Sequence, residues 1–338
     1  MTSNKGGRLP VADRLAPLAL LVMAMLWGST FFVLHDMLER VDAADLLGVR
    51  FTIAAVVFAA VVHRKLIINR TTLRQGAILG LIFGSAQLLQ TYGLAYTSAS
   101  ISGFLTGIYV VLTPILEALL FKARVRQRVW VAVGLATVGL AALTIAPGAG
   151  MVQFGIGETL TIVSALLYAM HIIYTGRVAT EQKAVTLAVF QTAGTAVLCL
   201  IGAIPGGIHF PQRTDDWMAL LYLALICGAL TAVLQTWAQS KIAATPSAVI
   251  MSSEPIWAAT FAILVGQEAF SMRTLVGGAA MVTAMVLSSL PDRSRTAMLR
   301  FEGKTALRPP TDECHGHRPA ESGSEPLGAY RSDPDPAH

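Results

Sequence analysis

Long apolar runs limit most strongly what this chain can fold into, because they recur along its whole length with only short polar breaks. Crossing the hydrocarbon of a bilayer takes roughly 20 mostly apolar residues as helix, since in lipid every backbone amide must be paired within its own segment. Ten runs meet this requirement and give the expected spans 15–35, 45–63, 76–96, 98–121, 129–147, 156–175, 184–204, 217–238, 246–266 and 274–290.

Composition favours a membrane protein over a soluble one. The 338 residues are 54% hydrophobic and 13% charged, whereas a soluble domain carries about 25% charged residues. The short breaks at 63–74 and 122–128 make consecutive helices antiparallel neighbours. The first run follows a basic start and is long, without an evident cleavage site, so we interpret it as a retained helix rather than a signal peptide. We predict an all-α integral membrane protein with ten transmembrane helices and the lipid bilayer as its surroundings.

The distribution of basic residues predicts the orientation of the chain. With the N-terminus inside, the inner segments up to residue 304 hold eighteen lysines and arginines and the outer segments only three, Arg40, Arg213 and Arg273. Such a bias places both termini in the cytoplasm. The net charge of +5 is therefore explained by topology rather than by a basic soluble face, and we expect no nucleic-acid partner.

An internal repeat appears when the chain is compared with itself at an offset of 141 residues. "AMLWGSTF" (24–31) then aligns with "ALLYAMHI" (165–172), and "LTPILEALLF" (112–121) with "SEPIWAATFA" (253–262). "VRFTIAA" aligns with "FQTAGTA", and "QTYGLAYTSAS" resembles "QTWAQSKIAAT" at an offset of 145. The expected organisation is a cytoplasmic N-terminus (1–14), a first repeat (15–147), an outer linker (148–155), a second repeat (156–290) and a tail (291–338).

Each repeat holds five spans, an odd number, so the second enters the membrane in the opposite orientation to the first. An inverted repeat of two five-helix units suits alternating access, because each half can take the conformation that the other has just left. This architecture favours a transporter over a receptor or channel. The tail is rich in proline, charge and small residues, and we expect it to be disordered.

The motifs also resemble a known family. "WGSTF", "VRF", "QTYGLAYTSASISGFLTGIYVVLTP", "QTWAQ" and "EPIWAATFAILVGQE" are similar to the EamA-type branch of the drug/metabolite transporter superfamily, over roughly 15–290. The resemblance implies ten helices, a central cavity lined mainly by the first, third, fourth, sixth, eighth and ninth, and no ATP-binding domain. It also implies export or exchange of small metabolites, amino acids or amphipathic compounds at the bacterial inner membrane. A second copy of the chain, in a homodimer, is a candidate partner.

Two aromatic residues occupy corresponding positions in the two repeats. Trp27 lies a dozen residues into the first span, deeper than the interfacial aromatic belt, and Tyr168 is its counterpart in the sixth. A midplane Trp facing a cavity offers a flat apolar wall with one N–H donor, while the alternative is plain helix packing. Gly28, Ser29 and Thr30 are small residues that let helices approach closely.

Ionisable residues within spans are costly and normally face the bundle interior. Glu254 precedes Pro255 near the middle of the ninth span and could carry a coupling proton or bind a substrate ammonium; the alternative is a structural carboxyl. Arg50 could attract an anionic substrate group or pair with Glu254 or Glu117. A salt bridge to Asp42 or Asp45 is the other interpretation.

The remaining candidates are polar, aromatic or hinge residues of the same spans. Glutamines and aromatic side chains together suit an amphipathic or zwitterionic solute, although helix-to-helix hydrogen bonding explains any single glutamine equally well. His171 could relay protons or be a hydrogen-bonded structural residue. The expected substrate-binding residues are Trp27, Gln87, Gln90, Tyr109, Tyr168, Gln235, Trp237 and Glu254, with Arg50, His171 and Glu254 in coupling or ion pairing and Pro114 and Pro255 as hinges.

A membrane-embedded enzyme or a sensor without transport activity is the alternative class. The chain has no H-E-x-x-H, G-x-S-x-G or Walker A motif, so we predict neither an enzyme nor a pump driven by ATP. Three scattered cysteines are too few for a disulfide framework. Cys314, His315 and His317 form only a short cluster without a second ligand pair, and we expect no metal site and no cofactor. We predict a secondary transporter of a small-molecule substrate.

Overall fold

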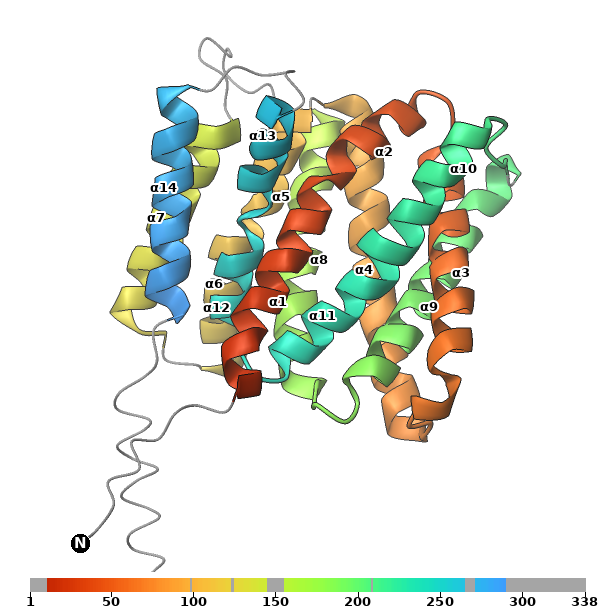
Figure 1. Cartoon of the computed structure of the whole chain (residues 1–338), viewed down its shortest axis with the longest axis horizontal. Helices are drawn as coiled ribbons and strands as arrows, with labels where there is room; N and C mark the ends of the chain where they lie inside the picture. Colours follow the sequence, from red (N-terminus) through yellow and green to blue (C-terminus); the bar gives the residue numbers. More distant parts are fainter. Residues whose placement is uncertain are drawn as a thin grey trace, which may run out of the picture. The chain divides into compact units, whose positions relative to one another are not determined.

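The computed structural model describes residues 11–97, 99–122, 125–144, 155–207, 209–264 and 271–289, all of which lie in helices or their connections (Figure 1). Within those ranges no strand is present, which confirms the expectation of an all-α chain. The first ten residues, most of the linker 148–155 and the tail 291–338 lie outside the described residues.

Each predicted apolar run falls on one or more helices. The helices are α1 (Val11–Gly28), α2 (Thr30–Leu38), α3 (Ala43–Val62), α4 (Arg70–Tyr96), α5 (Ala99–Gly107), α6 (Tyr109–Phe121), α7 (Gln127–Thr144), α8 (Ile156–Val178), α9 (Ala184–Ala203), α10 (Thr214–Leu221), α11 (Thr231–Gln239), α12 (Ala244–Met251), α13 (Glu254–Leu264) and α14 (Met272–Ser289), with the π-helical segment η3 (Tyr222–Leu230) between α10 and α11 and short 3₁₀ turns η1 (His63–Lys65) and η2 (Ile204–Gly206).

Length and hydropathy identify the chain as a membrane protein. Six helical segments of the described chain are long and apolar enough to cross a bilayer: 43–65, 70–96, 102–121, 156–178, 184–206 and 214–239. Three shorter apolar stretches, 15–28, 127–142 and 274–288, accompany them. Large apolar side chains also cover the outside; Val61 and Leu264 are both 75% exposed. Such a surface is stable in lipid and not in water.

Four of the predicted spans are interrupted near their middle. The first breaks at Ser29, between α1 and α2, and the fourth at Ile108, between α5 and α6. The ninth breaks at Ser252 and Ser253, between α12 and α13, where both hydroxyls donate back to carbonyls of α12. The eighth passes through η3. Irregular backbone of this kind is tolerated within a membrane span where it is buried in the protein or lines a cavity.

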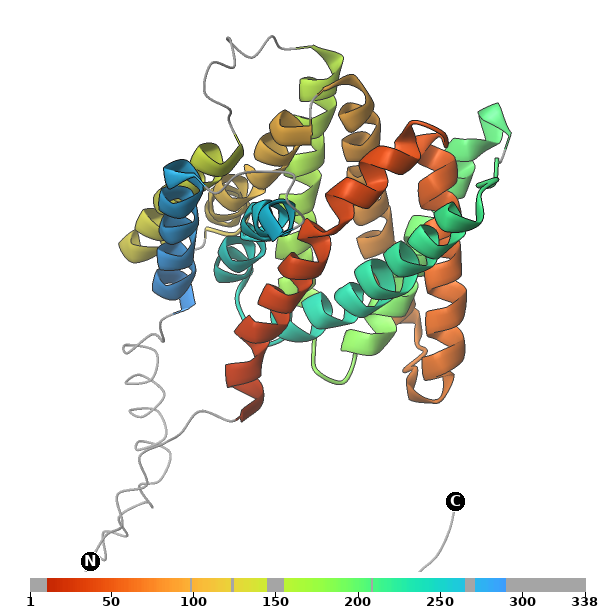
Figure 2. The same ribbon diagram turned by 45° about the horizontal axis from the view of Figure 1, so that its top comes forward.

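Packing joins the first five spans to the last five. The helices α3 and α4 pack along α9, α4 also packs along α8, and α7 packs along α14 (Figures 1 and 2). At the crossing of α4 and α9 a Cβ on Gly80 would lie 2.8 Å from the Cα of Gly194. Thr195 Oγ1 donates to the Gly80 carbonyl oxygen there, at 3.2 Å. Small residues with one hydroxyl bond hold helices together in lipid.

Candidate functional site

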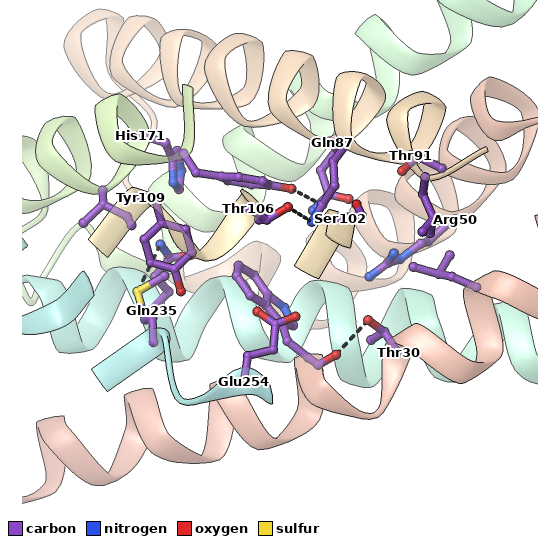
Figure 3. A pocket seen from close by; sticks show the side chains of 17 residues that line it. Thr30, Arg50, Gln87, Thr91, Ser102, Thr106, Tyr109, His171, Gln235 and Glu254 are labelled. Carbon is purple, nitrogen blue, oxygen red and sulfur yellow. Dashed lines mark hydrogen bonds between the residues drawn. The ribbon is translucent and has the colours of Figure 1, made fainter. Parts of the chain in front are cut away.

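A buried cavity lies where the interrupted spans meet (Figure 3). Its volume, measured for the centres of water molecules, is about 50 Å³, which is room for a few waters. Polar side chains from both halves of the chain line it among aromatic rings. The lining residues are Trp27, Thr30, Leu34, Arg50, Gln87, Gln90, Thr91, Leu94, Ser102, Thr106, Tyr109, Tyr168, His171, Ile172, Gln235, Met251 and Glu254.

The helix breaks explain why residues so distant in sequence converge here. Trp27 and Thr30 lie on either side of the α1–α2 break, and Tyr109 begins α6 directly after the break at Ile108. Glu254 begins α13, immediately after the break in the ninth span. Its carboxylate is therefore at the N-terminus of a short helix, where the helix dipole favours negative charge.

Trp27 is fixed by the π-helical segment of the eighth span. Its indole Nε1 donates to the carbonyl oxygen of Cys227 at 3.1 Å and to Thr231 Oγ1 at 3.2 Å. The ring stacks at 6.2 Å, centroid to centroid, on Phe83. Because its N–H is already paired, Trp27 offers the cavity an aromatic surface rather than the donor that the sequence suggested.

Arg50 is a buried cation without a carboxylate partner among the described residues. It is 3% exposed, and its Nε donates to the carbonyl oxygen of Leu223, in η3, at 3.1 Å. The salt bridge considered from sequence is not present: Asp45 accepts from His209 at 3.1 Å, and Asp42 caps α3 through the amide of Ala44. The guanidinium therefore faces the cavity with most of its donors unused.

Glu254 is the second ionisable group of the cavity and is half-buried. No hydrogen bond or ion pair joins its side chain to the described residues, so the pair with Arg50 considered from sequence is also absent. Its position is set by Gly28: a Cβ there would lie 2.7 Å from the Glu254 carbonyl oxygen and 2.8 Å from the Cβ of Trp257. The glycine of "WGSTF" thus lets α1 touch α13 at the start of the half-helix.

A hydrogen-bonded chain crosses the cavity between the two halves. The Tyr168 hydroxyl donates to Gln90 Oε1 at 2.7 Å, and Gln90 Nε2 donates to Thr106 Oγ1 at 3.0 Å. Tyr109 lies beside Tyr168, with ring centroids 6.5 Å apart. Gln87, one turn before Gln90, has no hydrogen bond to a described side chain and faces the cavity.

Two further polar candidates bond to their neighbours. His171 is 1% exposed, and its Nε2 lies 3.0 Å from Gln191 Oε1. Gln235 Nε2 donates to Gln239 Oε1 at 3.1 Å. Both residues line the cavity, yet these bonds also fit the structural role that the sequence left open for each. The assignment of either residue to substrate or proton remains a prediction.

Three predicted residues lie away from the cavity. Trp237, on α11, faces Lys241, whose Nζ lies 5.7 Å from the ring centroid. Pro255 borders a small neighbouring pocket with Tyr109 and Glu254. Pro114 lies inside α6, six residues after the break in its span. Glu117, proposed as a partner of Arg50, accepts instead from the Thr245 hydroxyl.

The sequence did not predict several of the lining residues. Ser102 and Thr106 lie in α5, and Met251 ends α12. The spacing of Ser102 and Thr106, four residues apart, places them on one helix face and could have indicated a polar stripe. Met251 has no such signal, because a methionine in an apolar span predicts only a side chain that packs in the core.

A smaller chamber adjoins the cavity behind Trp27. Its walls include Arg50, Gln87 and Gln235, which also line the main cavity, and add Gln191 and Thr192 from α9. Arg50 therefore borders both spaces. Within the described ranges no group of histidine, cysteine, aspartate and glutamate could hold a metal ion, and Cys199 and Cys227 are free and buried.

Apolar spans, interrupted helices and a polar cavity between the two halves define a membrane transporter. Comparisons with known proteins agree. A model of the EamA-like transporter family matches residues 14–145 and again 155–290. The chain belongs to the EamA-like transporter family. As a member, it is embedded in a lipid bilayer and acts on a small-molecule substrate.

Similar proteins carry transporter names. An uncharacterized transporter of Archaeoglobus fulgidus is 29% identical over 287 residues, which cover 85% of this chain and 90% of that one. The uncharacterized transporter YetK of Bacillus subtilis is 25% identical over 331 residues, covering 89% and 95%. A crystal structure with 17% identity superposes with a TM-score of 0.69 over 82% of this chain and 97% of the other, and shows the same fold. These names point to a transporter rather than an enzyme.

Proposed function

We propose that the protein is a secondary transporter that exports or exchanges a small zwitterionic or amphipathic solute by alternating access. The observation that carries the proposal is a basic and an acidic side chain, Arg50 and Glu254, that line one cavity without ionic partners among the described residues. A buried charge is costly unless it is paired. A substrate carrying an anionic group for Arg50 and an ammonium for Glu254 would compensate both.

Aromatic walls favour a solute with an apolar body. Trp27, Tyr109 and Tyr168 line the cavity from three different helices. Offset or edge-on stacking against such rings contributes about 0.5–1.5 kcal/mol beyond area burial. Gln87 adds an uncharged donor and acceptor. Together these groups suit a molecule of amino-acid size with a hydrophobic or aromatic side chain.

The packing supports an inverted repeat of two five-helix units. Numbering the spans in order, the second packs on the seventh (α3 on α9), the fifth on the tenth (α7 on α14) and the fourth on the ninth (α6 on α12). Each pair joins one span to its counterpart in the other repeat. The bond from Trp27 to the eighth span mirrors that from Tyr168 to the third. We propose ten spans, with both termini in the cytoplasm of a bacterial inner membrane.

Contacts at the end where α1 begins would act as the inner gate. The Thr245 hydroxyl binds Glu117, between α12 and α6. Nearby, the Arg177 guanidinium lies 3.2 Å from the centroid of the Phe121 ring. The cavity instead extends toward the other end, where Leu34 and Leu94 border it. A solute of amino-acid size exceeds the space for a few waters, so the halves must separate to admit it.

The breaks at Ile108 and at Ser252 and Ser253 are the proposed hinges, assisted by Pro114 and Pro255. They lie at corresponding places in the two repeats, and each adjoins a lining residue, Tyr109 or Glu254. An interrupted helix at a midplane site can bend without breaking further backbone hydrogen bonds. Rocking there would open the cavity to one side and then to the other.

The test compares three ligands that differ by one charged group. Phenylalanine carries both charges, 3-phenylpropionate lacks the ammonium and phenethylamine lacks the carboxylate. Counterflow in proteoliposomes is measured for wild type, Arg50→Gln, Glu254→Gln and the exposed control Arg64→Gln. We expect Arg50→Gln to lower phenylalanine transport about 10- to 100-fold, the equivalent of about 1.5–3 kcal/mol for a hydrogen bond to a charged group.

The two singly charged ligands separate a loss of substrate binding from a loss of folding. Weak binding of 3-phenylpropionate should disappear in Arg50→Gln and persist in Glu254→Gln, and phenethylamine should show the reverse. Arg64→Gln should match wild type. Full transport of phenylalanine and of other zwitterions by both cavity variants would rule out the proposed charge pair.

A further inference from the structure

A separate hollow lies on the outside of the bundle, between α4 and α9, away from the central cavity. Its volume is about 390 Å³, larger than the 50 Å³ of the central cavity. Its floor consists of the small residues Ala77, Ala193 and Gly194. The helices α4 and α9 touch beside this floor, at Gly80 and Gly194. The result is a shallow open groove between the two helices.

The walls of the groove are large and apolar. Leu73 and Leu81 stand on α4, and Phe190, Val197 and Ile201 stand on α9. Leu81, Val197 and Ile201 are 56%, 58% and 57% exposed. Among the described residues, no charged side chain lines the groove. In water such a surface would be unstable, and in a bilayer it is a place for hydrocarbon.

The length of the groove fits one leaflet. From Phe190 to Ile201 the α9 wall covers twelve residues, or about 16 Å over eleven steps of 1.5 Å. One leaflet contributes about half of the ~30 Å hydrocarbon thickness. An acyl chain lying along the groove would therefore contact the protein over nearly the whole thickness of that leaflet.

Two exposed cations stand at one end of the groove. Arg70 begins α4, and Arg74 follows one turn later; both are exposed. Helical periodicity places Arg70 on the same face as Leu73, Ala77 and Leu81, since these residues follow it at three, seven and eleven positions. Below the apolar groove, the two arginines reach the depth of lipid headgroups by extending toward water.

We propose that the groove between α4 and α9 binds one acyl chain of an anionic phospholipid whose headgroup phosphate contacts Arg70 and Arg74. Apolar walls and small floor residues accommodate the chain, and the two arginines select the headgroup charge. The inference is independent of the transported solute. It concerns the leaflet on the side where α4 begins.

The experiment measures lipid retention by the full-length protein. Delipidated protein in detergent is titrated with phosphatidylglycerol or with phosphatidylcholine carrying the same acyl chains, and bound lipid is counted by native mass spectrometry. Basic residues near a membrane surface each favour anionic lipid about fivefold. We therefore expect phosphatidylglycerol to be retained more than tenfold better than phosphatidylcholine at the first site.

Paired variants separate the chain from the headgroup. Ala193→Phe should fill the floor and lower retention of both lipids at least fivefold, whereas Val138→Phe, at a 64% exposed position on α7, should not. The double variant Arg70→Gln/Arg74→Gln should abolish the preference for phosphatidylglycerol but keep chain binding. Its control, Arg64→Gln/Lys65→Gln, removes the same charge from η1 and should keep the preference.

Three results would overturn the proposal. Equal retention of the two lipids by wild type removes the headgroup contact, and unchanged retention by correctly folded Ala193→Phe, judged by circular dichroism, removes the groove. A wild-type dimer that Ala193→Phe converts to a monomer would assign the groove to a second copy of this chain instead.

Discussion

Trp27 and Arg50 owe their positions to the same short piece of backbone. Trp27 donates to the carbonyl of Cys227 and Arg50 to that of Leu223, four residues earlier in η3. A π-helix shifts backbone hydrogen bonding by one residue, and such segments are frequent at functional sites. The π-helical segment therefore holds both an aromatic wall and the cation of the cavity.

Gly28 gives the sharpest prediction at a single residue. Replacing it by Ala puts a methyl group 2.7 Å from the Glu254 carbonyl oxygen, so α1 and α13 must move apart. Overpacking of this kind costs about 1–3 kcal/mol. We expect Gly28→Ala to lower the thermal midpoint in detergent and to reduce transport. Gly134→Ala, where nothing lies within 4 Å, should leave both unchanged; equal effects would contradict the contact.

Tyr168 supports a second prediction about a hydrogen bond. Tyr168→Phe keeps the ring but leaves Gln90 Oε1 without its donor, at a cost of about 1–3 kcal/mol. The affinity for phenylalanine should fall, because the Gln90 side chain can then turn away from Thr106. Tyr174→Phe on the same helix removes a hydroxyl that has no hydrogen bond to the described residues, and serves as the control. Isothermal titration of phenylalanine measures the difference, and indistinguishable affinities would refute the coupling.

Sequence reasoning found the polar and aromatic members of the cavity for a definite reason. A residue such as Arg50, Gln90 or Glu254 inside an apolar span is costly in lipid, so its presence predicts an inward position. The same reasoning expected Trp237 in the cavity, but its ring packs against the buried core and lies beside Lys241. It could not assign hydrogen-bond partners, which depend on how distant helices pack. The roles of the lining residues in transport stay predictions.

At the level of whole helices, interruption is the feature that builds the site. In the first span the helix is interrupted at Ser29, between α1 and α2, where the small residues of "GST" predicted only close helix packing. In the fourth span the proline drew attention to Pro114, whereas the break lies at Ile108. A proline inside a helix removes one bond but need not end it. The prolines thus pointed to the fourth and ninth spans, whereas the sequence did not predict the interruptions of the first and eighth.

The two prolines are expected to behave differently. Pro255 is the second residue of α13, where a backbone N–H would lack an intrahelical acceptor in any case. Pro114 lies within α6 and removes the bond to the Val110 carbonyl. Pro114→Ala should therefore raise the thermal midpoint and slow turnover, while Pro255→Ala should leave the midpoint nearly unchanged. A larger rise of the thermal midpoint in Pro255→Ala than in Pro114→Ala would instead place the hinge at Pro255.

On the scale of the molecule, the sequence predicted the helical class and the membrane, and both are confirmed. The ten-span inverted repeat, the inner-membrane location, a homodimer and the absence of a nucleic-acid partner remain predictions. The asymmetric distribution of basic residues predicts the direction in which the chain inserts into the membrane. The packing of the helices against one another is the same in either direction. Orientation therefore has to be measured.

Cysteine labelling decides the orientation of the repeats. In a variant with Cys199, Cys227 and Cys314 replaced by Ala, single cysteines are introduced at Glu39 and Gln182, which lie at corresponding turns of the two repeats and are both exposed. An inverted repeat puts these turns on opposite faces, because each repeat holds an odd number of spans. In intact cells an impermeant maleimide should label the cysteine at 39, and the one at 182 only after permeabilisation. Labelling of both from one side would mean that the halves run in parallel, and they could not exchange conformations as alternating access requires.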